Sequence, residues 1–131
     1  MKIRNILIAT VLSVTVASAD DVMKKSMNLM NHGMTDIQTG FMNNNLDMIK
    51  NGVVMVEEGN KLFSDLKTIS KYMPDNKKHL SNTAKKHSDT IKQQINVLTG
   101  NLDKNAYLQA GKAYADMLNA CSSCHAIVRN W

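Results

Sequence analysis

Residues 23–41 read Met-Lys-Lys-Ser-Met-Asn-Leu-Met-Asn-His-Gly-Met-Thr-Asp-Ile-Gln-Thr-Gly-Phe. Large apolar residues recur in this stretch at intervals of 4, 3, 4, 3 and 4 positions: Met23, Met27, Met30, Met34, Ile37 and Phe41. Such intervals keep side chains on one side of an α-helix. We therefore predict an amphipathic helix, whose apolar side is called the methionine face below.

The same helical pattern recurs through the rest of the chain. Three further helices are predicted, over residues 46–70, 77–99 and 104–128. Four helices of about 20–25 residues joined by short loops favour an all-α fold, an antiparallel up-down-up-down four-helix bundle. In that topology the start of the first helix lies beside the end of the last, so the methionine face should meet the C-terminal residues.

Turn-forming residues separate the predicted helices. Gly40 and Asn43–Asn45 should end the first helix, and Pro74 should separate the second from the third because proline lacks a backbone donor. Gly100–Asn101 should end the third helix. Asp103 is predicted to cap the last helix at its N-terminus.

The first 19 residues resemble a secretory signal peptide. Lys2 and Arg4 precede an apolar run over residues 6–16, and Ala17–Ala19 is a small-residue cleavage pattern. The apolar run is short for a bilayer span. We therefore predict export to the periplasm and cleavage of residues 1–19, without stable membrane insertion afterwards.

Cleavage would leave residues 20–131 as a single domain of 112 residues, enough for one core. This mature chain has 14 basic and 11 acidic residues, a formal net charge of +3. An exported chain without interleaved basic and aromatic residues is not expected to bind nucleic acid. The lysines are expected to be solvated or to face an acidic partner.

The candidate reactive residues of the chain lie in one stretch, Cys121-Ser122-Ser123-Cys124-His125. C-x-x-C-H is the attachment pattern of a c-type haem: two thiols on one helix face can bond its vinyl groups, and the histidine can bind the iron. A zinc site would require further ligands, and a redox dithiol is expected in a βαβ context. We therefore predict one covalent haem c, held by Cys121, Cys124 and His125.

These features together resemble the class II cytochromes c, which include cytochrome c-prime and its low-spin methionine-ligated relatives. The attachment motif matches at Cys121, Cys124 and His125, and Arg129 matches a basic residue that the family places near the haem propionates. The resemblance implies a four-helix bundle, and it leaves a homodimer through the first two helices open.

The methionine face resembles the first-helix pattern of the same family, in which the leading position faces the distal side of the iron. By this register Met27 is the expected sixth ligand, followed by Met30 and then Met23. Most of these methionines must pack around the haem, because methionine fills irregular gaps and only one can bind. Ligation by His32 or His87 stays open as an alternative.

Several functions fit a haem protein of this kind. His/Met ligation predicts a one-electron carrier between periplasmic redox proteins, and not an enzyme, since no acid–base pair or nucleophile is visible in the sequence. The alternative is a five-coordinate, cytochrome c-prime-like protein that binds nitric oxide or another gas. A haem enzyme would require an open distal site with a proton donor, for which His32 is the nearest candidate.

Overall fold

The computed structural model describes residues 19–129 of the chain, which are helical apart from short connections. The elements are α1 (Ala19–Met42), α2 (Leu46–Leu62), α3 (Leu66–Tyr72), the 3₁₀ helix η1 (Asp75–Leu80), α4 (Ser81–Leu102) and α5 (Tyr107–Val128). No strand occurs within these residues, which confirms the all-α prediction there. The predicted signal peptide lies outside the described residues except for Ala19. Among the described helices, none is long and apolar enough to cross a membrane.

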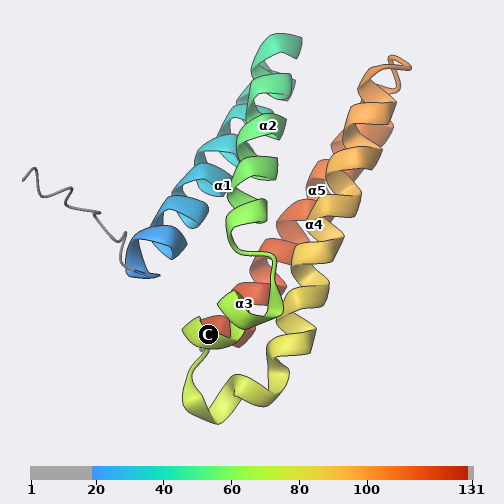
Figure 1. Cartoon of the computed structure of the whole chain (residues 1–131). Coiled ribbons are helices and arrows are strands. Elements are labelled where there is room, and N and C mark those ends of the chain that lie inside the picture. The colour runs from blue at the N-terminus through green and yellow to red at the C-terminus, as the bar shows by residue number, and fades with distance from the viewer. Residues whose placement is uncertain (1–18, 130–131) are drawn as a thin grey trace, which may run out of the picture.

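The long helices form two hairpins, α1 with α2 and α4 with α5, and they run alternately up and down (Figure 1). One buried cluster draws on all four of them. It consists of Met30, Met34 and Ile37 from α1, Ile49, Val53 and Val56 from α2, Ile91, Ile95, Leu98 and Leu102 from α4, and Ala110, Ala113, Met117 and Ala120 from α5. This shared core packs the two hairpins into one helical bundle.

A second, smaller core lies at the end of the molecule where the C-terminus is found (Figure 1). Its buried centre combines Phe63, Ile69, Met73 and Ala84. Met23 from the start of α1 packs against this centre, as does Val128 from the end of α5. The beginning of α1 and the end of α5 are therefore close together, as the antiparallel order predicts.

Asparagine residues supply the special backbone conformations and a helix cap in the loops of the two hairpins. Asn44 and Asn105 adopt φ values of 52° and 57°, in the left-handed region that asparagine tolerates better than most residues. Asn45 caps α2 by accepting a hydrogen bond from the Met48 amide at 3.0 Å. The turn predicted at residues 43–45 is confirmed, whereas the stop predicted at Gly40 is wrong because α1 continues to Met42.

The predicted helix over residues 46–70 is interrupted. α2 ends at Leu62, and Asp65 begins α3 by accepting a hydrogen bond from the Thr68 amide at 2.9 Å. Hydrogen bonds from the Thr68 side chain and then from its amide hold the Asp65 pKa below its usual value. Ser and Asp offer local hydrogen bonds that compete with a continuous helix. Phe63, the residue directly after α2, is buried.

The other predicted boundaries also shift. Residues 75–80, expected partly within the third helix, form η1, and α4 begins at Ser81 and continues through Gly100. Asp103 does not cap α5, which begins at Tyr107 after Ala106. In place of a cap, the Ala106 amide donates to the Asn101 carbonyl at 2.8 Å, so the turn satisfies its own backbone groups.

α1 and α2 approach each other through glycine. A Cβ added to Gly33 would lie 2.5 Å from the Gly52 carbonyl oxygen, and one added to Gly52 would lie 2.5 Å from the Gly33 carbonyl oxygen. Gly40 and Gly59, each seven residues further along its helix, are similarly crowded. Only residues without a Cβ permit this backbone contact, which explains why Gly40 lies inside a helix.

Replacement of Gly33 by alanine tests this contact. Gly33→Ala should lower the free energy of unfolding by about 1–3 kcal/mol, since the Gly52 carbonyl oxygen and the Val56 amide nitrogen near the new Cβ are backbone atoms and cannot rotate away. Gly111→Ala is the matched control: a Cβ there meets nothing within 4 Å, and alanine should stabilise the helix by up to about 1 kcal/mol. Urea denaturation followed by circular dichroism measures both, and equal stabilities would contradict the contact.

Candidate cofactor-binding site

A cavity of about 510 Å³ lies among the four long helices. Its lining residues are Met27, Asn28, Met30, Asn31, Met34, Asn60, Phe63, Ser88, Ile91, Leu118, Cys121, Ser122, Cys124, His125 and Arg129. The volume falls within the range of small-molecule and cofactor sites. Every residue singled out above as a cofactor ligand or contact, apart from the lower-ranked Met23 and the alternative histidines, lines this cavity.

α5 supplies the thiols and imidazole of the site. Cys121, Cys124 and His125 are at positions i, i+3 and i+4 of one helix, so their side chains share a face. All three are partly buried and line the cavity. The arrangement that the motif predicted for the helix is therefore present, with the shared face directed at the space between the helices.

A second cavity of about 470 Å³ adjoins the first at the C-terminal end of the molecule. The residues common to both are Met27, Phe63, Cys124, His125 and Arg129. Met23, Tyr72 and Val128 line only the second. His125 and Met27, which come from the last and the first long helix, thus line both cavities.

Burial controls the protonation of the α5 side chains. It raises the pKa of Cys121 to about 11, with a smaller contribution from Cys124, and it also raises the pKa of Cys124. The pKa of His125 is lowered by burial and then by the positive charge of Arg129. At neutral pH the thiols are protonated and the imidazole is neutral, the form in which histidine binds a metal.

The raised cysteine pKa values do not fit a redox dithiol. Reactive cysteine pairs have a thiolate stabilised near or below neutral pH, whereas Cys121 and Cys124 are shifted in the opposite direction. Within residues 19–129, no three His, Cys, Asp or Glu side chains gather as a metal site, so the zinc interpretation gains no further ligand there.

The methionines of α1 face α5 across the cavity. Met30 and Met34 are buried, each 9% exposed, while Met27 is partly buried and packs against both hydrophobic cores. Met23 borders only the second cavity. Arg129, just after α5, is exposed and borders both cavities.

The alternative histidines lie elsewhere. His32 is exposed on α1, and His87 is partly buried on α4. Neither lines either cavity, whereas Met27 and Met30 do. Among the described residues, His125 is the histidine that the fold brings to this site.

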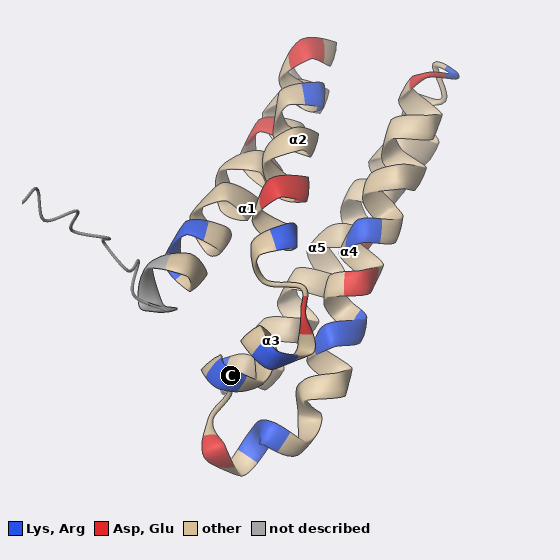
Figure 2. Ribbon diagram, viewed as in Figure 1, with Lys and Arg blue, Asp and Glu red and all other residues tan. Residues whose placement is uncertain are grey.

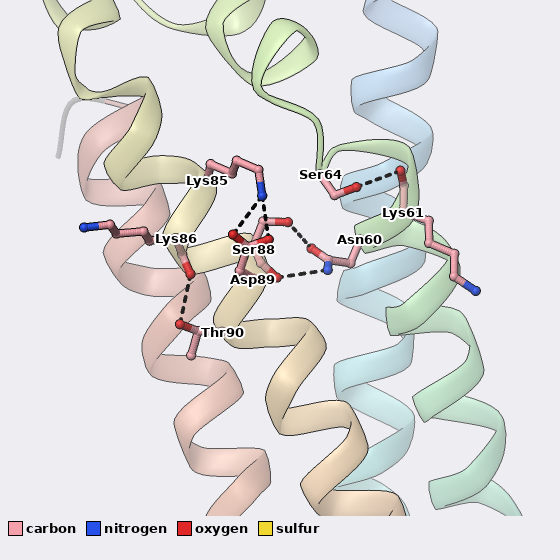
Figure 3. A network of polar contacts seen from close by, with 8 residues as sticks. All are labelled: Asn60, Lys61, Ser64, Lys85, Lys86, Ser88, Asp89 and Thr90. Carbon is pink, nitrogen blue, oxygen red and sulfur yellow. Dashed lines mark hydrogen bonds and ion pairs between the residues drawn. The ribbon is translucent and has the colours of Figure 1, made fainter.

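Two buried polar residues of the cavity wall were missed by the sequence analysis. Asn60 on α2 donates from Nδ2 to the Ser88 carbonyl oxygen at 3.0 Å, and the Ser88 hydroxyl on α4 donates back to Asn60 Oδ1 at 2.8 Å. Figure 3 shows this reciprocal pair between the two helices. Each residue interrupts an otherwise apolar helix stripe, and that interruption is the signal that could have found them.

Comparisons of the chain with protein-family models, with curated proteins and with solved structures find no match. The assignment of a function therefore depends on the residues of the site.

The thiols should be slow to react in the folded chain. A pKa near 11 in place of the ordinary value of 9.0 lowers the thiolate fraction of Cys121 at pH 8 about 100-fold. In the chain expressed without haem, alkylation by iodoacetamide at pH 8, followed by peptide mass spectrometry, should modify Cys121 at least that much more slowly in the folded state than in urea. Equal rates in the two states would contradict the buried placement.

Proposed function

We propose that this protein is an exported monohaem c-type cytochrome that carries single electrons between periplasmic redox proteins. One observation carries the proposal. Both thiols and the imidazole of the C-x-x-C-H stretch border the same cavity as the Met27, Met30 and Met34 side chains, which come from the opposite end of the chain.

The donor set supports a covalent haem. Each cysteine S–H can add across a vinyl group, so that sulfur bonds one vinyl carbon and the proton goes to the other, without an oxidant. The neutral imidazole of His125 can bind iron on the α5 side. Phe63, Ile91 and the methionines supply the apolar walls that a porphyrin requires. The bound group would supply the one-electron ferric–ferrous couple.

Methionine ligation favours electron transfer over gas binding. Because the cysteines and His125 are all on α5, an iron held by them would have its opposite side toward the other lining residues, among which are the methionines of α1. Met27 is the leading candidate because it borders both cavities together with His125, and Met30 is the next. A thioether favours ferrous iron, raises the potential and closes the iron to other ligands.

The two-hairpin arrangement supports the class II cytochrome interpretation. Four long helices alternate in direction, and the cysteine motif lies near the end of the last one. In this interpretation the bundle holds the haem between the first and last helices, and Arg129 pairs with a propionate through its guanidinium.

The charge distribution supports transient docking at the C-terminal end. Residues 61–90 contain seven lysines and three aspartates, and Figure 2 shows basic positions gathered around α3, η1 and the start of α4. Asp75 and Asp89 form ion pairs with Lys78 and Lys85, both at 2.7 Å. The remaining positive charge would attract an acidic redox partner, and salt would weaken that encounter.

Haem attachment is the first test. Expressed with a c-type maturation system, the protein should gain the mass of one haem, and the haem should stay with the polypeptide in acidified acetone. Cys121→Ala and Cys124→Ala should each retain at most one thioether, and the double variant none. A polypeptide mass without haem, and no visible absorption, would rule out the proposal.

The visible spectrum of the haem-loaded protein tests the axial ligand. We expect low-spin spectra in both oxidation states, the weak ferric methionine-to-iron band and little response of the reduced form to carbon monoxide. Met27→Ala should abolish the band and open the iron to carbon monoxide, whereas Met42→Ala, at a side chain 77% exposed, should change neither. A high-spin spectrum with ready carbon monoxide binding in the unmodified protein would favour the gas-binding alternative.

A further inference from the structure

The Asn60–Ser88 pair is unusual for its place in the molecule. Asn60 is 5% exposed and Ser88 is 6% exposed, and each belongs to a different hairpin. Two apolar side chains would pack this junction without the cost of burying polar groups. Both residues also line the cavity, so the pair borders the space assigned above to the haem.

The carboxamide of Asn60 retains hydrogen-bonding capacity. An asparagine side chain has two N–H donors and an oxygen with two acceptor positions. The bonds with Ser88 use one N–H and one acceptor position. In the part of the chain that the structure describes, the second N–H has no other acceptor, while the side chain borders the cavity.

Asn60 lines the cavity from α2, whereas the cysteines and His125 line it from α5. If the cysteines and His125 held the iron from α5, the side of the iron away from α5 would face the other lining residues of the cavity, which come chiefly from α1, α2 and α4. Among those residues the buried polar side chains are Asn60 and Ser88, and the Ser88 hydroxyl already donates to Asn60. The methionines of α1 line the same cavity.

We propose that Asn60 is a positioning residue that donates a hydrogen bond from its second amide N–H to the thioether sulfur of the methionine ligand. Ser88 holds the carboxamide in the orientation that this bond requires. The inference rests on the proposed function. A donor on the sulfur withdraws electron density from the iron, which disfavours the ferric state and raises the midpoint potential.

Removal of the donor should therefore lower the potential. In the haem-loaded protein, Asn60→Leu should decrease the ferrous-to-ferric ratio at a fixed applied potential about two- to tenfold, the range of one net hydrogen bond. Ser88→Ala should shift the ratio in the same direction by less, because the amide keeps its bond to the backbone carbonyl of residue 88 and loses only the hydroxyl that donates to its oxygen. Asn51→Leu makes the same chemical change on the exposed face of α2 and should leave the ratio unchanged.

Spectroelectrochemical titration measures the ratio, the ferric sulfur-to-iron band reports the ligand, and urea unfolding of the same samples reports stability. We expect Asn60→Leu to shift the potential and the band as well as stability. A purely structural role would lower stability and leave the potential and band as they are, which would overturn the inference. If Asn60→Leu does not yield folded protein, Ser88→Ala decides in the same way.

The outcomes also separate this inference from the function on which it rests. Without covalent haem in the unmodified protein, both fail. With covalent haem and a methionine-to-iron band, but an equal potential in the Asn60→Leu and Asn51→Leu proteins, only the role of Asn60 fails. An open sixth position in the unmodified protein would also overturn it, because no thioether would be there to accept the bond.

Discussion

The backbone contact between Gly33 and Gly52 is the constraint on which the site depends. α1 carries the methionines, and its rotation about its own axis decides whether they face the interior. With Gly33 pressed against α2, the flanking Met30 and Met34 are directed into the core and onto the cavity wall. Side chains at the contact would push the helices apart, and the wall of the cavity would move with α1.

The junction between the two hairpins is built differently. It combines apolar residues of all four long helices with the hydrogen bonds of Asn60 and Ser88, and it leaves a cavity that residues of α1 and α5 line. A fully packed bundle would have no room for a cofactor. The polar pair gives the junction a specific register, since a shifted α2 or α4 would leave buried amide and hydroxyl groups without partners.

The helix content and the proximity of the start of α1 to the end of α5 could be predicted from sequence, because the first depends on local periodicity and the second on the antiparallel order of the helices. The break after Leu62 could not be read from apolar spacing, because Phe63 continues the apolar stripe and the hydrogen bond that Asp65 accepts at the start of α3 does not alter that spacing. Gly40 was wrongly predicted to end the first helix, because its role in the close contact between α1 and α2 can be recognised only once the position of α2 is known. The roles of Asn60 and Ser88 could not be predicted from either residue alone, because they depend on hydrogen bonds between two residues that are 28 positions apart in the sequence.

The position of the cavity between hairpins has a thermodynamic consequence. Any group that contacts α1 and α5 together binds only when the hairpins are docked, so its binding free energy is added to that of folding. If that group were bonded covalently to α5, its contact with α1 would become intramolecular. The strength of the contact would then depend on the effective concentration of the α1 side chain, and no longer on the weak affinity of a free thioether for the group. If the group is the proposed haem, docking of the hairpins and binding of the methionine to its iron would be a single cooperative event.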